Sequence, residues 1–306
     1  MKQGRSLSTF KEIRKFLIDI DIKSMIDNRE FKLPKNIVNE FYNRDVDDIL
    51  NDIILKIYDA IIEPEQLANH NTYDDNEFRL KYIKNTDRKV FDTNVVKELL
   101  NNQVIDEIEV DSEHGGLLPT KNPSDVANDG LIFLLIGLPA SGESTIARKI
   151  SDRFKCLTLD CDIAKRKIPE FKARNGASLV HKESNEIINE IRNIAIEKNF
   201  NIIEPIIGSE YQEVETFIEK MKKEKYKVFL IHSDIEPELS VKRTIKRFIE
   251  TGRYVPIDKI IDVYYTKTKE TFRLVSSYKE IKCINIDTSK SNSFEELDDF
   301  LNKIVL

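Results

Sequence analysis

The residues from 137 to 145 read Gly-Leu-Pro-Ala-Ser-Gly-Glu-Ser-Thr, and they lie between a short apolar run and an amphipathic segment. Glycines at this spacing let the backbone curl until successive N–H groups and a helix N-terminus face one anion. A hydroxyl group after the second glycine can bind Mg²⁺ between two phosphates. The segment therefore predicts a phosphate-binding loop with Ser144 as a metal ligand. Its candidate binding residues are Gly137, Ser141, Gly142, Ser144 and Thr145.

The residue after the second glycine opposes that chemistry. A G-x-x-x-x-G-K-[ST] loop has lysine at the position that Glu143 occupies here. Two unit charges about 4 Å apart at an effective dielectric constant of about 20 interact by roughly 4 kcal/mol, so replacing attraction by repulsion costs several kcal/mol. At about 1.4 kcal/mol per factor of ten in rate, we predict that the chain as written is catalytically inactive or nearly so.

Two explanations of Glu143 are open at this point. Either the glutamate is natural and the domain is a pseudokinase or nucleotide-binding scaffold, or the sequence is a disabled variant of an active kinase. The remaining candidate residues look complete, which favours the second explanation.

Two carboxylates follow a second short apolar run, Asp160 and Asp162, on either side of Cys161. Carboxylates at the C-terminal edge of a parallel strand can accept a proton from an attacking hydroxyl or hold Mg²⁺ through water. A residue beyond the strand end can turn toward the acceptor, so Asp162 is the candidate base and Asp160 the candidate metal-side residue. The alternative for such a strand end is a helix cap.

A basic helical segment covers residues 240–261. Arg243 and Arg247 are four positions apart and therefore share one helical face, and Arg253 follows in a turn that contains glycine. Planar guanidinium groups bind phosphate oxygens and transition-state charge well. The alternative interpretation is a solvated basic helix.

Four segments of the sequence together resemble the zeta-toxin family of kinases, over about residues 131–280. They are LDCDIAKRKIPEF at 159–171, VHKES at 180–184, NIIE at 201–204 and the arginine segment. The three residues after Glu204, Pro-Ile-Ile, depart from the small residue and threonine usual in that family.

The resemblance implies transfer of the γ-phosphoryl group of ATP or GTP, with Mg²⁺, to a hydroxyl of a small nucleotide-type substrate. Family members use UDP-N-acetylhexosamines or, in related branches, dinucleotides. In this resemblance Asp162 is the base toward the substrate hydroxyl, and Glu143 stands at the position of a catalytic lysine. The other implied site residues are Arg247 and Arg253 for the triphosphate, and Lys165, Glu183 and Glu204 for the substrate.

Polynucleotide 5'-hydroxyl kinases are the alternative enzyme class. They also combine such a loop with an arginine helix that runs into V-P-I-D, which matches Val255 to Asp258. They need an electropositive channel for a nucleic-acid end. Residues 131–306 hold 30 lysines and arginines against 28 acidic residues, and no basic stripe with interleaved aromatic residues is visible, so nucleic acid is the less favoured partner.

The elements that would position these residues show two different sequence patterns, one before and one after residues 111–130. Residues 1–110 lack glycine after Gly4 and show helical periodicity, for instance from Val46 to Ile61, which predicts a mostly α-helical domain. Asp92 to Asn94 is a candidate cap for a helix through Leu100. Residues 111–130 contain three glycines and two prolines and predict a linker.

Residues 131–306 alternate short β-rich runs with longer helical patterns. Such alternation predicts an α/β fold, here a phosphate-loop kinase domain whose parallel sheet is flanked by helices. The expected strands are 131–136, 156–160, 200–204, 226–232 and 281–287.

Composition limits the compartment and the partners of this 306-residue chain. Three cysteines without metal-site or disulfide spacing, and the absence of an apolar leader or a membrane-length run, predict a cytoplasmic protein with no membrane partner. Residues 1–130 carry 18 basic against 26 acidic residues, which leaves a net charge of −8. This asymmetry favours an antitoxin or other protein partner for the N-terminal domain.

Overall fold

The computed structural model describes residues 9–33, 35–67, 71–79, 85–101, 125–172, 176–251, 254–290 and 293–304. It divides into two compact units, each made from two separate stretches of chain. The first comprises Met1–Asn69 and Glu236–Val263, and the second comprises His70–Ile235 and Tyr264–Leu306.

The first unit is helical. Its elements are α1 (Phe10–Asp19), α2 (Ile22–Asp27), α3 (Lys35–Tyr42), α4 (Val46–Leu67), α11 (Pro237–Thr251), α12 (Ile257–Lys259) and most of a π-helical turn, η5 (Ile260–Tyr264). Helix α1 begins with a capping box, because the hydroxyl of Thr9 accepts the N–H of Glu12 while the Glu12 carboxylate accepts the N–H of Thr9. Helices α1 and α2 pack on α4.

Helix α11 is joined to the N-terminal helices of this unit. The N–H of Lys32 donates to the carboxylate of Glu250 on α11 at 2.5 Å. Phe41 and Ile53, from α3 and α4, line a pocket of ≈ 300 Å³ together with Phe248 of α11. The arginine-bearing helix therefore belongs with residues of the first third of the chain.

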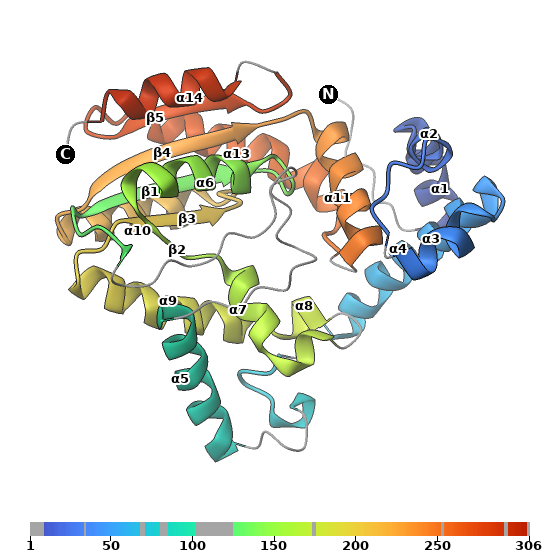
Figure 1. The fold of residues 1–306 in the computed structure, drawn as a ribbon, viewed down its shortest axis with the longest axis horizontal. Coiled ribbons are helices and arrows are strands. Elements are labelled where there is room, and N and C mark those ends of the chain that lie inside the picture. The colour runs from blue at the N-terminus through green and yellow to red at the C-terminus, as the bar shows by residue number, and fades with distance from the viewer. Residues whose placement is uncertain are drawn as a thin grey trace. The chain divides into compact units, whose positions relative to one another are not determined.

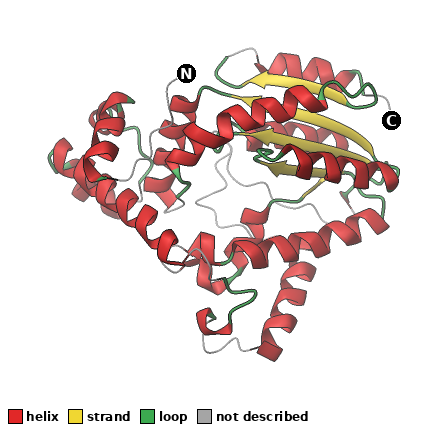
Figure 2. Cartoon of the chain, turned by 180° about the vertical axis from the view of Figure 1, so that it is seen from behind, coloured by secondary structure: helices red, strands yellow, loops and turns green. Residues whose placement is uncertain are grey.

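The second unit is built on a five-stranded sheet (Figures 1 and 2). All its strand pairs are parallel, and the strand order is β2-β3-β1-β4-β5. The strands are β1 (Leu131–Gly137), β2 (Leu157–Thr158), β3 (Ile202–Ile206), β4 (Lys227–Asp234) and β5 (Lys282–Asp287).

The remaining elements of this unit connect the strands or precede them. They are η1 (Asn76–Phe78), α5 (Asn85–Asn101), α6 (Glu143–Phe154), α7 (Cys161–Lys167), η4 (Pro169–Lys172), α8 (Gly176–Leu179), α9 (His181–Glu197), α10 (Tyr211–Lys223), α13 (Tyr265–Val275) and α14 (Ser293–Asn302). The predicted α/β fold with a parallel sheet and flanking helices is confirmed.

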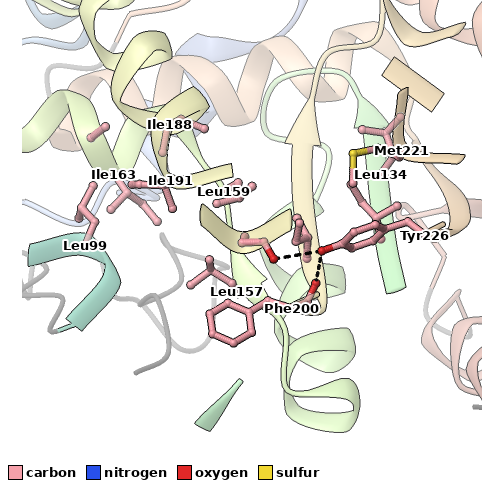
Figure 3. Close-up of a cluster of buried hydrophobic side chains, with 14 of the residues drawn as sticks. Leu99, Leu134, Leu157, Leu159, Ile163, Ile188, Ile191, Phe200, Met221 and Tyr226 are labelled. Atoms are coloured by element: carbon pink, nitrogen blue, oxygen red, sulfur yellow. Dashed lines mark hydrogen bonds between the residues drawn. The ribbon is translucent and has the colours of Figure 1, made fainter. Parts of the chain in front are cut away.

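Alternate residues of β1 enter two different cores. Leu131, Phe133 and Leu135 pack with side chains of α6 and α14, whereas Ile132 and Leu134 pack with side chains of α5, α7, α9 and α10. All of β1 is buried, as expected for a central strand that is covered on both faces. Figure 3 shows the second core, in which the Tyr226 hydroxyl donates to the carbonyls of Ala195 and Phe200.

The two units differ from the domains expected from the sequence. Helix α5, expected in the N-terminal domain, packs on α7 and α9 of the second unit, whereas α11, expected in the kinase domain, belongs to the first. Helical periodicity shows that one face of a helix is buried, but it carries no information on which element covers that face. Helix α5 also begins at Asn85, so Asp92 to Asn94 lie inside it and do not cap it.

No helix within the described ranges is long and apolar enough to cross a membrane.

Candidate active site

The predicted phosphate loop connects β1 to α6. Its backbone turns through left-handed conformations at Ala140, with φ of 59°, and at Gly142, with φ of 99°, where glycine avoids the strain that a side chain would bring. Gly142 is the N-cap residue of α6, and its carbonyl accepts the N–H of Thr145 at 3.0 Å. The curled backbone and the N-terminus of a 12-residue helix, which has no side-chain cap, are what an anion-binding loop requires.

Gly137 is needed at the start of the loop for a different reason. A Cβ at this position would lie 2.7 Å from the Ser141 hydroxyl and 2.9 Å from the Ser233 carbonyl. The loop therefore closes back onto the end of β1 so tightly that only glycine fits without a shift.

Residues at the carboxyl ends of two other strands anchor the loop, Ser233 within β4 and Thr288 directly after β5, and the sequence analysis did not find them. The hydroxyls of Ser233 and Thr288 both donate to the Ser141 carbonyl, at 2.8 and 2.5 Å. The N–H of Thr288 also donates to the carbonyl of Asp234 at 2.9 Å. No local motif marks Ser233 or Thr288, because their position beside the loop depends on β4 lying next to β1 and β5 lying next to β4.

One hydroxyl group at the base of the loop has no hydrogen-bond partner among the described residues. The Ser141 side chain is fully buried, yet its hydroxyl has no hydrogen-bond partner among the described residues. Ser144 and Thr145, in the first turn of α6, are partly exposed. Together with the glycine cradle, these hydroxyls fit phosphate oxygens and, at Ser144, a Mg²⁺ ion.

Glu143 is the one feature of the loop that does not fit. It is the first residue of α6, where the partial positive charge of the helix N-terminus stabilises its carboxylate. The same position would favour a bound phosphate, so Glu143 adds local stability while opposing a second anion. The backbone of the loop therefore suits a nucleotide and the charge of Glu143 does not.

Asp160 and Asp162 follow β2, at the carboxyl end of the sheet. Asp160 is the N-cap of α7, and its carboxylate accepts the N–H of Asp162 at 2.9 Å. The helix-cap alternative therefore describes Asp160. Lys165 donates to the Asp162 carboxylate at 3.0 Å, and these two side chains are 13% and 19% exposed.

Two further polar side chains lie next to this pair. The Cys161 thiol donates to the side-chain oxygen of Asn185, on α9, at 2.8 Å. Burial together with the charge of Asp160 raises the pKa of Cys161 to about 12. Burial, reinforced by the charge of Lys165, lowers the pKa of His181. The structure thus brings Asp162, Lys165 and His181 into one cluster, with His181 favoured in its neutral form.

Glu204 lies inside a strand, although the sequence pattern placed it at a strand end. Strand β3 continues through Pro205 to Ile206 and pairs with β1 along its whole length, while β2 pairs only with Ile202 and Ile203. Proline lacks an N–H, and it is tolerated here because the ladder to β2 has already ended. Glu204 accepts two hydrogen bonds from Arg192, at 2.5 and 3.0 Å, and its side chain is 7% exposed.

Glu183 has neighbours that the sequence analysis did not anticipate. Its carboxylate is buried and accepts hydrogen bonds from the guanidinium of Arg88 and from the hydroxyl of Thr72. Burial favours the neutral acid, but these bonds lower the pKa of Glu183 below its usual value. Glu183 therefore contacts residues of the N-terminal third of the chain, and these contacts join that part of the chain to α9.

Two of the three candidate arginines lie on α11 in the first unit. Arg243 and Arg247 are both partly buried there, and burial lowers the pKa of Arg243. Arg253 lies outside the described residues. The phosphate loop and the Asp162 cluster belong to the second unit, so the structure describes the two groups of candidate residues separately.

A parallel sheet with a glycine-rich loop between its central strand and the next helix defines a phosphate-loop kinase fold. The family model for zeta toxins matches residues 119–294, more than half of the sequence, and the chain belongs to this family of kinases. Kinases of this family use a nucleoside triphosphate.

One solved structure of low sequence identity supports the same fold, and a second match is weaker. A chain from the PezAT chromosomal toxin–antitoxin system of Streptococcus pneumoniae superposes with a TM-score of 0.50 at 12% identity, covering 74% of this chain and 100% of that one. A gluconokinase from Sinorhizobium meliloti 1021 matches with a TM-score of 0.36 at 12% identity, covering 57% and 92%. A search of curated protein sequences gave no significant match.

Proposed function

We propose that the active form of this protein transfers the γ-phosphoryl group of ATP or GTP to a hydroxyl of a small nucleotide-type substrate, such as a UDP-sugar or a dinucleotide. The observation that carries the proposal is the glycine-built loop after β1, whose buried Ser141 hydroxyl lacks a partner among the described residues. The carboxylates that follow β2 supply the acid–base chemistry that such a transfer needs.

The proposed roles follow from where each side chain lies. The loop from Gly137 to Thr145 binds the phosphates through backbone N–H groups and hydroxyls, and Ser144 with Asp160 holds Mg²⁺, which neutralises charge on the transferred group when bound. Asp162 orients the acceptor hydroxyl and takes its proton. Lys165 donates to one oxygen of the Asp162 carboxylate and so fixes its orientation.

Four further residues complete the proposal. Arg247 and Arg253 stabilise the charge of the transferred phosphoryl group, as planar guanidinium groups do in related chemistry. Glu204, paired with Arg192, contributes to the substrate side of the site. Glu183 acts there only through its buried contacts with Arg88.

We further propose that Glu143 makes the present chain a poor nucleotide binder and an inactive or nearly inactive kinase. A natural pseudokinase with the same fold is the competing explanation. The two differ in what a lysine at this position would do, since a recently disabled enzyme regains its function and a long-standing pseudokinase does not.

The substitution Glu143→Lys tests this directly. We expect ATP affinity to rise and turnover to rise by a factor on the order of 10³ or more, because repulsion near the β and γ phosphates becomes attraction. Nucleotide binding is measured by calorimetry, and phosphoryl transfer is measured with UDP-sugars, dinucleotides and an oligonucleotide 5'-hydroxyl as acceptors.

The control is Glu143→Gln, which removes repulsion without adding a positive charge and should give an intermediate affinity. If neither variant binds ATP more tightly or turns it over faster, the disabled-enzyme account is wrong and the pseudokinase explanation leads. Transfer to the oligonucleotide alone would favour the polynucleotide-kinase alternative.

We also propose a protein partner of antitoxin type for the acidic N-terminal part of the chain. Its net charge of −8 over residues 1–130 supports a partner with a basic surface. Co-purification with the product of the adjacent gene, and loss of that complex at high salt, would support the proposal. A complex insensitive to salt would contradict the electrostatic basis.

A further inference from the structure

Arg88 of α5 is a large charged side chain with almost no contact with solvent, since it is 1% exposed. Its guanidinium donates to both oxygens of Glu170, at 2.9 and 2.8 Å, and to both oxygens of Glu183, at 2.5 and 2.7 Å. The Thr72 hydroxyl also donates to Glu183. These four residues, Thr72, Arg88, Glu170 and Glu183, are here called the Arg88 cluster.

The cluster joins two elements that border the Asp162 site. Glu170 lies in η4, directly after α7, and Glu183 lies in the first turn of α9. At the other end of the same α7–η4 segment, Cys161 is hydrogen-bonded to Asn185 of α9. The segment that carries Asp162 is therefore tied to α9 at both ends, and the Arg88 cluster forms one of the two ties.

Helix α5 brings Arg88 to this place by packing into the core. Val95, Val96 and Leu99 of α5 are buried in the same core as Ile163 of α7 and residues of α9. Figure 3 shows Leu99 beside Ile163 and on the same side of the cluster as Ile188. A surface ion pair between Lys167 of α7 and Glu98 of α5, at 2.5 Å, adds a second link between these helices.

Stability alone does not explain a cluster of this kind. Desolvation of buried charges offsets much of their attraction, and apolar residues of similar volume often stabilise a protein as well or better. A guanidinium held by both oxygens of two carboxylates fixes their spacing and orientation in a way that apolar packing does not. The arrangement therefore serves geometry, and the geometry that it sets is that of the α7–η4 segment against α9.

We propose that Arg88 is a positioning residue for the reaction, which holds Asp162 and Lys165 in place by fixing α7 and η4 against α9. The consequence for catalysis rests on the function proposed above, whereas the positioning itself does not. Residues before the phosphate loop would then be part of the machinery of the kinase unit, although they contribute no group to the substrate.

Site-resolved thiol labelling of the full chain tests the positioning. Cys161 reports whether α7 stays on α9, because its partly buried thiol at the start of α7 donates to the side chain of Asn185 on α9. In Arg88→Met we expect the labelling rate of Cys161 to rise on the order of tenfold, with that of Cys283 changed less than about twofold.

The matched control is Lys182→Met. Lys182 forms an exposed ion pair with Asp74, and this pair joins α9 to the same N-terminal stretch that carries Thr72. Its loss should leave both labelling rates unchanged, because exposed pairs contribute little. An unchanged Cys161 rate in folded Arg88→Met, or an equal rise at Cys161 and Cys283, would overturn the proposal.

A second variant covers the case in which Arg88→Met does not fold. Arg88→Met combined with Glu170→Gln and Glu183→Gln leaves no buried ion without its partner, so folding is retained while the bridge is lost. The same two labelling outcomes then decide the proposal.

Kinetics in the Glu143→Lys background supply the readout that a purely structural role would not give. Loss of the cluster should lower kcat on the order of tenfold or more and leave KM for ATP within about twofold, because the nucleotide binds to other elements. Parallel losses in kcat and in ATP affinity would contradict positioning. A Glu143→Lys protein without any activity would refute the proposed function and leave the labelling result to decide the positioning.

Discussion

The phosphate loop and the proposed acceptor side of the site, formed by residues of α7, α9 and β3, are built by different means. The loop depends on backbone geometry and neutral groups, with two left-handed residues, two glycines and the hydroxyls of Ser233 and Thr288. The acceptor side depends on ion pairs: Asp162 with Lys165, Glu204 with Arg192, and Glu183 with Arg88.

This difference shows which substitutions should change activity without changing the stability of the fold. A side chain at the mouth of a backbone-built loop can change its charge without disturbing the fold, and Glu143 even suits the helix end at which it lies. On the acceptor side, each carboxylate balances a cation, so a charge change there affects stability and chemistry together. Three experiments extend this contrast, in order of decreasing expected effect.

The largest effect is expected at Asp162 in the Glu143→Lys background. Asp162→Asn should lower turnover by roughly 10²- to 10⁴-fold with little change in ATP affinity, because it removes the proposed base that orients the hydroxyl. Single-turnover phosphoryl transfer and an ATP titration measure the two quantities.

Asp160→Asn is the matched control for that experiment. It should weaken Mg²⁺ dependence and nucleotide affinity together and reduce helix stability, since Asp160 caps α7. If Asp162→Asn keeps full turnover and Asp160→Asn abolishes it at unchanged ATP affinity, the two roles are exchanged.

The second experiment targets the ion pair between Arg192 and Glu204. Arg192→Met leaves the carboxylate of Glu204, which is 7% exposed, without its cation, and should lower the free energy of unfolding by about 3–5 kcal/mol. Urea denaturation measures the change.

Two comparisons sharpen this result. Adding Glu204→Met to Arg192→Met should recover most of the loss, because no buried charge then remains unbalanced. Lys267→Met, which removes the exposed pair of Lys267 with Glu210, should cost less than about 1 kcal/mol. Equal losses in Arg192→Met and Lys267→Met would show that the acceptor-side pair is no more important than a surface pair.

The smallest effect is a pH dependence at Asp92, on α5 beside the Arg88 cluster. Burial and the charge of Glu183 raise the pKa of Asp92 to about 7, although Arg88 and Arg79 act in the opposite direction. Below about pH 7 an acid with this raised pKa is protonated in the folded chain, while the unfolded chain loses the proton at lower pH. The contribution of Asp92 to the free energy of unfolding therefore falls as pH rises toward about 7 and is constant above it.

Asp92→Asn removes this dependence. The melting temperature of the variant relative to the unmodified chain should therefore be higher at about pH 8 than at about pH 5. Asp74→Asn is the control of opposite sign, because Lys182 lowers the pKa of Asp74 and the stability that this gives is lost as pH falls. A difference for Asp92→Asn that does not vary with pH would contradict the raised pKa.

The parts of this fold that the sequence predicts are those with local signals. Five short apolar runs gave the five parallel strands, and the glycine spacing gave the loop between β1 and α6. Strand ends are less accurate, since β2 spans two residues and β3 continues through Pro205. An isolated proline indicates the end of a strand unless the position of its neighbours in the sheet is known.

The contacts that no local pattern predicts are those between distant segments. Arg88 appears in the sequence as one charge among many in a polar helix, and its burial follows only from the packing of α5 on α7 and α9. Ser233 and Thr288 likewise acquire their role from strand order. The loop and the fold around it could be predicted from motifs, whereas the residues that anchor the loop and the α7–α9 contact could not.

The chain enters the first unit twice, once at its start and again through α11, after β4 and before α13. Neither unit is therefore a continuous piece of the gene. A truncation before the phosphate loop would take Val95, Val96 and Leu99 out of the kinase core. It would also remove Lys32, which binds Glu250 of α11, and the residues of α3 and α4 that lie beside Phe248. Deleting the N-terminal third is thus a perturbation of folding, and point substitutions are the cleaner means to ask what that third regulates.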